Sequence, residues 1–214
     1  MNIAIVVDNP ISWFVPFARE LNHRLQRFGV VTVLQSAADI LPGNGVSFLL
    51  SCESKVPKDL LARSRNNIVV HASDLPKGKG MSPLTWQILE GENTIPITLF
   101  EAVEAIDAGT IYLKDSIALQ GNELLHEIQA ALGTKIIHMC ERFMDRYPGI
   151  VSEGIPQDGT PTFYRRRTAD DSRLDPERTL AEQFNLLRVV DNEQYPAFFV
   201  WQGRRFTLKI DVSL

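Results

Sequence analysis

The sequence has few cysteines and no excess of basic residues, and each shortage excludes a class of protein. Two of its 214 residues are cysteines, Cys52 and Cys140, too few for a disulfide framework or a four-ligand zinc site made of cysteines alone. Both stand in apolar surroundings, which predicts buried, reduced thiols in a cytoplasmic protein. Lysine and arginine number 22 against 26 aspartates and glutamates, a net charge of −4. Proteins that neutralise a run of phosphates carry a basic excess, so we expect no nucleic-acid partner.

Long apolar runs are also missing. The longest, such as residues 46–50, have the length of a strand and cannot span a membrane. Residues 1–10 lack the basic flank and the small-residue cleavage site of a signal peptide. No GxGxxG follows the first apolar run and no GxxxxGK[ST] occurs, which argues against a nucleotide-dependent dehydrogenase and a P-loop protein. We therefore expect a cytoplasmic protein with no membrane partner and no metal.

The sequence does contain a regular alternation of strand and helix patterns. Apolar runs predict strands over residues 3–7, 30–34, 46–50, 68–71, 95–100 and 110–113, and helical spacing predicts helices over 14–25, 58–63, 84–89 and 124–143. Strands that are apolar throughout and alternate with helices indicate a parallel sheet covered on both faces. The predicted class is α/β.

A change in composition near residue 150 divides the chain. Residues 149–162 are rich in glycine and proline, which marks a boundary or a surface crossing. We expect an α/β domain over residues 1–150 and a small α+β subdomain over 151–214. The subdomain would contain strands at 162–166, 197–201 and 206–210 and a helix at 180–190. Its apolar run over residues 197–201 is a candidate surface for pairing two subunits.

Two ionisable residues are the first candidates for chemistry. In open parallel sheets, ligands bind outside the carboxyl ends of the strands. His71 ends the fourth predicted strand, and Asp107 lies in a glycine-containing loop that precedes another. A histidine paired with a carboxylate can move a proton near neutral pH, as acyl transfer to an amine requires. The alternatives are a structural histidine and an aspartate that binds a turn amide. Neither stands near a nucleophile elbow, so covalent catalysis is not expected.

Further candidates flank this pair. Lys77 and Lys79 lie in a Lys-Gly-Lys-Gly stretch that suits contact with a phosphate or a glutamate tail. Trp13, with Asn9 nearby, stands at the start of the first helix, where an indole can stack on a base or sugar. The alternatives are that the two lysines are solvated loop residues and that Trp13 packs in the core.

Two segments resemble the folate-dependent formyltransferases. Residues 69–76 read VVHASDLP, Gly80 and Pro83 follow, and residues 106–109 read IDAG. The resemblance covers about residues 46–119 and implies a Rossmann-like formyltransferase domain. It also implies transfer of a formyl group from 10-formyltetrahydrofolate to a primary amine by an asparagine, a histidine and an aspartate. His71 and Asp107 match two of these three residues.

The chain departs from the family at the third residue. The family's asparagine stands two positions before the histidine, where this chain has Val69. Asn66 and Asn67 are close, but sliding either into place would break the strand register. Without the asparagine, a donor is missing for the negative charge that develops on the formyl oxygen, the oxyanion. Either His71 with a backbone amide supports this oxyanion, or Ser73 does, or the activity is reduced. The resemblance also implies that the folate lies against the backbone of two loops. The first, residues 51–56, consists of Ser51, Cys52, Glu53, Ser54, Lys55 and Val56, and the second, residues 100–107, contains Phe100, Glu101 and Val103.

The carboxyl-terminal part resembles one branch of that family. Residues 163–172, FYRRRTADDS, are similar to a segment of the formyltransferases that act on UDP-amino sugars, and residues 187–199 are similar to a later segment. The guanidinium groups of Arg165, Arg166 and Arg167 suit a diphosphate. The alternative is that the three arginines lie on the solvated edge of a strand.

These observations together favour an N-formyltransferase for a nucleotide-linked amino sugar. The resemblance implies a UDP-4-amino-4,6-dideoxyhexose used in surface or flagellar glycans, with the nucleotide sugar and the folate as the small-molecule partners. A glycinamide ribonucleotide enzyme would carry a glycine-rich phosphate loop after the first strand, where this chain has residues 8–13, DNPISW. A methionyl-tRNA formyltransferase is the second reading, although we expect it to need a larger, basic carboxyl-terminal domain. A catalytically silent binder of folate or sugar nucleotide is the third, suggested by Val69.

Overall fold

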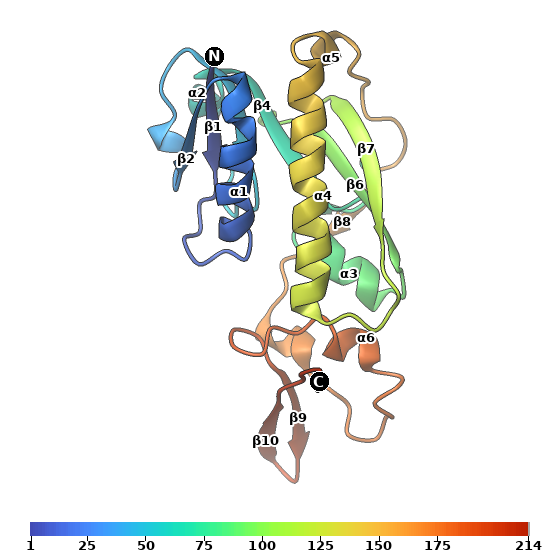
Figure 1. Ribbon diagram of the computed structural model, residues 1–214. Coiled ribbons are helices and arrows are strands. Elements are labelled where there is room, and N and C mark those ends of the chain that lie inside the picture. The colour runs from blue at the N-terminus through green and yellow to red at the C-terminus, as the bar shows by residue number, and fades with distance from the viewer. Residues whose placement is uncertain (214) are drawn as a thin grey trace.

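The computed structural model describes residues 1–213, and a six-stranded sheet organises them (Figure 1). Its strands are β1 (Asn2–Val6), β2 (Val30–Leu34), β3 (Asn44–Leu49), β4 (Ser64–His71), β6 (Thr94–Glu101) and β7 (Ile111–Ala118), in the order β2-β1-β3-β4-β6-β7. The first four in that order pair in parallel, and β6 is antiparallel to both of its neighbours. The mainly parallel α/β fold expected from the apolar runs is confirmed.

Two helices cover one face of this sheet. α1 (Val15–Leu25) and α4 (Leu125–Arg146) lie side by side on it (Figure 1). Alternate residues of the strands, such as Ile5 and Phe48, are fully buried in the main core beneath them. Gly133 on α4 permits close packing of the two helices, because a Cβ there would lie 2.6 Å from the ring of Phe17. This face is a closed core.

The opposite face is covered only in part. Ala4, Val6, Ile40 and Leu49 form its buried cluster, and Val69 packs against them. Only a short helix, α2 (Lys58–Leu61), and a 3₁₀ turn at Ala37–Asp39 accompany this face. Incomplete cover beside the carboxyl ends of β3 and β4 leaves room for a cavity.

Short elements bring the chain back to this edge of the sheet. After β4, the chain forms β5 (Lys79–Gly80) and α3 (Pro83–Leu89), and α4 is followed by α5 (Gly149–Ser152). β8 (Phe163–Tyr164) then pairs in parallel with β5. Residues from beyond position 150 therefore pack on the α/β domain, and a division of the chain at residue 150 stays a prediction.

The last part of the chain has a small core of its own. It contains α6 (Phe184–Leu187) and a hairpin of β9 (Ala197–Trp201) and β10 (Arg204–Leu208), with Leu174 and Val190 among its buried residues. The expected helix at 180–190 is wrong in extent, since only Phe184–Leu187 is α-helical. Turns take the place of its first part. The N–H of Gln183 bonds to the carbonyl of Leu180, three residues back, and the carbonyl of Thr179, which an α-helix would pair with that N–H, accepts a hydrogen bond of 3.3 Å from the Gln183 side chain instead.

Within residues 1–213, no helix combines the length and the apolar character needed to cross a membrane. The same residues contain no cluster of three or more histidine, cysteine, aspartate or glutamate side chains placed to hold a metal ion.

Candidate functional site

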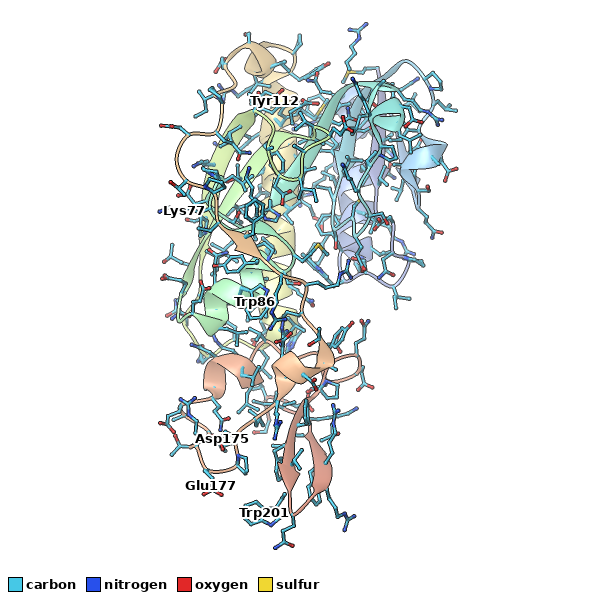
Figure 2. The ribbon with its side chains drawn as sticks, turned by 180° about the vertical axis from the view of Figure 1, so that it is seen from behind. Lys77, Trp86, Tyr112, Asp175, Glu177 and Trp201 are labelled. Carbon is cyan, nitrogen blue, oxygen red and sulfur yellow. The ribbon has the colours of Figure 1, made fainter. Side chains whose placement is uncertain are left out.

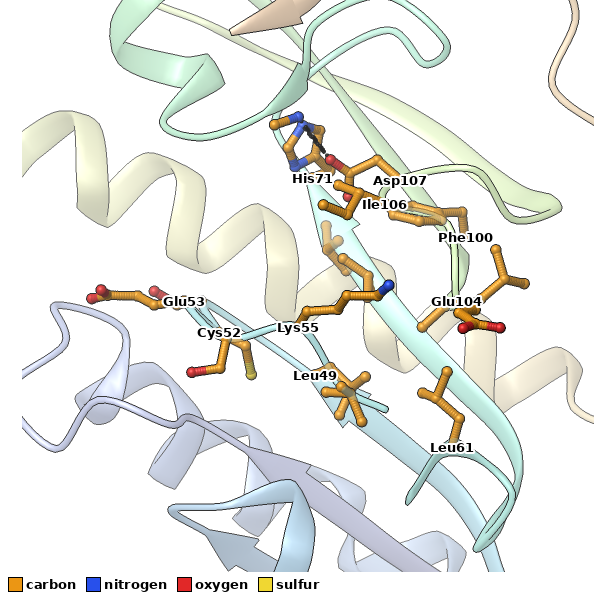
Figure 3. Close-up of a pocket in the computed structure, with 18 of the residues that line it drawn as sticks. Leu49, Cys52, Glu53, Lys55, Leu61, His71, Phe100, Glu104, Ile106 and Asp107 are labelled. Atoms are coloured by element: carbon orange, nitrogen blue, oxygen red, sulfur yellow. Dashed lines mark hydrogen bonds and ion pairs between the residues drawn. The ribbon is translucent and has the colours of Figure 1, made fainter. Parts of the chain in front are cut away.

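A cavity of about 240 Å³ lies beside the carboxyl ends of β3 and β4 (Figure 3). The end of β4, the loop after β3 and the loop after β6 form its walls. These are the places where an open sheet leaves strand ends and loops free to bind a ligand. The cavity is therefore the candidate site.

His71 lines this cavity at the last position of β4. Its Nε2 lies 2.9 Å from the carbonyl oxygen of Gly78 and 3.8 Å from Oδ2 of Asp107. A carbonyl oxygen can only accept a hydrogen bond, so Nε2 carries a proton in this arrangement. Among residues 1–213, no group bonds to Nδ1, which is therefore the nitrogen left for a ligand.

Asp107 completes the pair from the loop between β6 and β7. Its Oδ2 accepts a hydrogen bond of 2.8 Å from the backbone N–H of Gly80. The His71 and Asp107 side chains are only 11% and 14% exposed, and partial burial strengthens their mutual attraction when His71 is protonated. The structure thus brings together the two residues that the sequence named as a catalytic pair (Figure 3).

Most of the residues expected to bind folate line the cavity. They are Ser51, Cys52, Glu53, Ser54, Lys55, Val56, Phe100 and Val103. The thiol of Cys52 is no nucleophile here, because burial raises its pKa to about 12.

Glu101 is the exception, and its expected place at the folate site is corrected. Adjacent residues of a strand point to opposite faces, and Phe100 is the one that faces the cavity. The Glu101 carboxylate instead accepts hydrogen bonds from the backbone N–H of Asn67 at 2.6 Å and from the Tyr112 hydroxyl at 2.9 Å. Burial raises the pKa of Glu101, and these bonds oppose the shift. Its role is to tie β4 to β6 and β7.

Ser73, expected as a support for the oxyanion, is also corrected. Its side chain is 1% exposed, and Ser73 is not part of the cavity wall. Its hydroxyl oxygen is buried without a hydrogen-bond partner among the described residues. The turn after β4 takes Ser73 away from the wall, and its backbone N–H bonds to the carbonyl of His71.

Val69 does lie on the wall. It pairs with Leu49 on one side and with Phe100 on the other, and all three line the cavity. The wall is therefore apolar at the position where the resemblance implies an amide.

The sequence missed several wall residues. They are Leu49, Leu61, Val70 and Met81, whereas Ala102, Glu104 and Ile106 also line the cavity and lie in the loop over residues 100–107 that was expected to contact the folate. Most are apolar and look like core positions in a sequence, since only the pairing of β3, β4 and β6 shows that they share an opening. Gly80 also lines the cavity, and the sequence named it as part of the segment that resembles the formyltransferases.

Two of the residues expected to bind substrate lie at the edge of the cavity. Asn9 donates a hydrogen bond of 2.9 Å to Oε1 of Glu53, and Arg166 lies 3.2 Å from Oε2 of the same carboxylate. Glu53 itself lines the cavity. Three segments distant in the sequence thus meet beside the opening.

The other expected substrate residues lie elsewhere. Trp13 is partly buried and packs edge-on against Phe14 and Phe17. Lys77 is exposed on the outer loop (Figure 2), and Lys79 is buried within β5.

The two remaining arginines have protein partners. Arg165 pairs with Asp171, holding the pKa of that carboxyl well below its usual range, and stacks over Trp86 at 4.7 Å. Arg167 is half-buried, which lowers the pKa of its guanidinium. The structure therefore separates the three arginines, and only Arg166 reaches the cavity's edge.

Comparison with known proteins identifies the kind of domain that carries this site. Residues 43–135, which include Val69, His71 and Asp107, match the family model described as formyl transferase. The methionyl-tRNA formyltransferase of Streptococcus gordonii is 31% identical over 160 residues, which are 72% of this chain and 49% of that protein. The chain spans about half the length of the curated relatives it matches, 49% and 43% of two of them.

Three solved structures share the fold over nearly the whole chain. Methionyl-tRNA formyltransferase from Clostridium thermocellum has a TM-score of 0.80 at 22% identity, covering 100% of this chain and 94% of that one. A likely sugar N-formyltransferase from Mycobacterium tuberculosis has a TM-score of 0.73 at 19% identity, covering 100% and 98%. HypX from Aquifex aeolicus, solved in complex with tetrahydrofolic acid, has a TM-score of 0.75 at 18% identity, covering 97% and 37%. The Rossmann-like fold and the resemblance to folate-dependent formyltransferases are confirmed.

Proposed function

We propose that this protein is an N-formyltransferase that moves a formyl group from 10-formyltetrahydrofolate to the amine of a nucleotide-linked amino sugar. The observation that carries the proposal is the His71–Asp107 pair at the wall of a cavity, within residues that match the formyl transferase family. We further propose a UDP-4-amino-4,6-dideoxyhexose for surface or flagellar glycans as the acceptor.

The cavity suits the ring system of a folate. Leu49, Val69 and Phe100 give it apolar walls that can flank a flat ring, and backbone of the surrounding loops supplies polar groups at the ring's edge. Lys55 is exposed at the rim, where its ammonium can meet the carboxylates of a glutamate tail. HypX, the relative solved with tetrahydrofolic acid, supports this choice of donor.

When bound, the donor would supply a formyl group: its carbon bonds to the amine nitrogen, its bond to the folate nitrogen breaks, and that folate nitrogen takes up one proton in exchange for the proton that the amine loses. His71 stabilises the negative charge that develops on the formyl oxygen, donating from Nδ1 when the ring is protonated. The carboxylate of Asp107, whose Oδ2 lies 3.8 Å from Nε2, faces the opposite nitrogen of the ring. Because Oδ2 of Asp107 already accepts the N–H of Gly80, Oδ1 is the oxygen available for the amine's proton.

The acceptor would lie at the edge formed by Asn9, Glu53 and Arg166. Arg166 is more than half exposed and its pair with Glu53 is weak, so a diphosphate can take the carboxylate's place. The likely sugar N-formyltransferase of Mycobacterium tuberculosis, which shares the fold over the full chain, supports this substrate class.

A methionyl-tRNA acceptor is the second candidate, because a curated relative with that activity is 31% identical to this chain. The net charge of −4 favours a small acceptor over a polyanion. The test is a formylation assay with 10-formyltetrahydrofolate against a panel of UDP- and dTDP-linked amino sugars and methionyl-tRNA, read by mass spectrometry. Product from an amino sugar alone supports the proposal, and product from the tRNA alone contradicts it.

We also propose that the protein acts in the cytoplasm as a homodimer. Both cysteines are free thiols, which suits a reducing compartment. The β9–β10 hairpin presents Trp201, 49% exposed, and Phe206, 38% exposed, and Trp201 lies at its far end (Figure 2). Such aromatic surface favours burial against a second copy. Sedimentation of the parent and of Trp201→Lys tests this: a dimer that the substitution dissociates is expected, and a monomeric parent contradicts it.

A further inference from the structure

The segment after α5 contacts the supports of both residues in the proposed catalytic pair. Residues 155–164, the return segment, run from α5 back along the sheet to β8 (Figure 1). They first pair with β7, where the backbone groups of Ile155 and Ile111 exchange hydrogen bonds of 2.8 and 2.9 Å. This pairing fixes the segment beside the loop that contains Asp107.

Gln157 of the return segment forms hydrogen bonds with the loop that contains Asp107. Its Nε2 donates hydrogen bonds to the carbonyl oxygens of Asp107, at 2.9 Å, and Gly109, at 3.0 Å. Asp107 has a φ of +48°, a left-handed conformation that few residues other than glycine adopt. Gly109 sits where a Cβ would lie 1.7 Å from the carbonyl oxygen of Glu101. The amide of Gln157 thus bonds both residues on which the shape of the loop depends.

Thr162 supports His71, the other member of the pair, through Gly78. Its hydroxyl accepts a hydrogen bond of 2.8 Å from the N–H of Gly78, and its carbonyl accepts one of 2.9 Å from Lys79. The carbonyl of the same Gly78 accepts the bond from Nε2 of His71, and Gly80, two residues on, donates to Asp107. The strand that orients both side chains is therefore itself held by Thr162.

We propose that the return segment positions the catalytic pair, with Gln157 holding Asp107 and Thr162 holding His71 through Gly78. This inference rests on the proposed function. Neither Gln157 nor Thr162 lines the cavity, so both act on the reaction through other residues and are positioning residues. It follows that residues beyond position 150 are part of the catalytic apparatus even though none of them touches the reacting atoms.

The expected effect is on turnover and not on donor binding. A displacement of a catalytic group by about 1 Å can cost about 100-fold in rate. We expect Gln157→Met, similar in size but without the N–H donors, and Thr162→Val, which lacks the hydroxyl, each to lower kcat by about 10- to 100-fold. The KM for the donor should stay within about threefold, because neither substituted side chain lines the cavity. Thr162→Ser keeps the hydroxyl and should restore most of the rate, which a loss of packing alone would not predict.

The experiment measures kcat and donor KM for the parent and these variants, with Thr160→Ala as a control. Thr160 is exposed in the same segment, and no side-chain hydrogen bond joins it to another residue of the described chain. Parental kcat in folded Gln157→Met and Thr162→Val overturns the inference and leaves the proposed function standing. An equal fall in Thr162→Val and Thr162→Ser also overturns the role of the hydroxyl.

An inactive parent would contradict the proposed function instead, and a second measurement then decides the inference. Hydrogen exchange of residues 102–110 is expected to be faster in Gln157→Met than in the parent and in Thr160→Ala. Exchange at the parental rate would show that Gln157 does not hold the Asp107 loop.

Discussion

Replacing Val69 by asparagine is expected to raise the rate of formyl transfer by about 10- to 100-fold. A single preorganised donor to a developing oxyanion is worth about 10²- to 10³-fold in rate, and part of that is lost because no neighbouring group has been selected to orient the new amide. Val69 lies on the cavity wall between Leu49 and Phe100 and two residues before His71 on β4, so the amide would face the cavity proposed for the donor on the same side of the strand as His71.

The same substitution should lower stability, which makes the result diagnostic. An amide set among apolar side chains with no protein partner costs about 1–3 kcal/mol. Urea denaturation should therefore show a less stable protein that is nonetheless a faster enzyme. Val69→Leu is the control, since it changes the shape of the wall without adding a donor, and no gain in rate is expected from it.

Steady-state kinetics with 10-formyltetrahydrofolate and the best acceptor of the panel measures the effect. The reasoning is refuted if folded Val69→Asn binds the donor and turns over no faster than Val69→Leu. A parent without activity that gains it on Val69→Asn would identify the natural chain as the silent binder.

Three further predictions concern stability and reactivity. Gly133→Ala should lower the free energy of unfolding by about 1–3 kcal/mol, because the new Cβ would lie 2.6 Å from the ring of Phe17. Gly149→Ala is the control, since no atom lies within 4 Å of a Cβ at that position, and it should leave the free energy of unfolding unchanged. Equal midpoints of the two variants in urea would contradict this prediction. Burial raises the pKa of Glu101 above its ordinary 4.5, so the folded state binds this proton more tightly than the unfolded state does. The free energy of unfolding should therefore fall as pH rises from about 4.5 through the raised pKa, and Glu101→Gln should make this dependence on pH weaker. The same dependence in the parent and in Glu101→Gln would refute the assignment. Because burial raises the pKa of Cys52 to about 12, iodoacetamide should alkylate it at pH 8 far more slowly than a free thiol in urea-unfolded protein, and equal rates would contradict its burial.

The sequence predicts the sheet and names the two residues of the candidate catalytic pair because both depend on local patterns. Runs such as residues 46–50 are apolar on both faces, which only buried strands require, and β3 forms there. His71 and Asp107 are named from their motifs, and the sheet brings them within 3.8 Å.

What the sequence does not predict depends on pairing between distant segments. Glu101 turns away from the cavity because β6 pairs with β4 in a register that no local pattern specifies. Gln157 looks like an ordinary linker residue until the return segment is seen to bond the Asp107 loop. The overlong helix prediction at 180–190 has a local cause, since the side chain of Gln183 bonds to the Thr179 carbonyl that an α-helix would pair with the backbone N–H of Gln183.

The measurement that tests the central claim most directly is formyl transfer by the parent, His71→Ala and Asp107→Ala under identical conditions. With 10-formyltetrahydrofolate and a nucleotide-linked amino sugar, mass spectrometry should show the acceptor gaining one formyl group with the parent. Each folded variant should be slower by about 10²- to 10⁴-fold, the range expected for loss of a general acid or base. Formylation at the parental rate by either variant, or none by the parent over long incubation, would contradict the account.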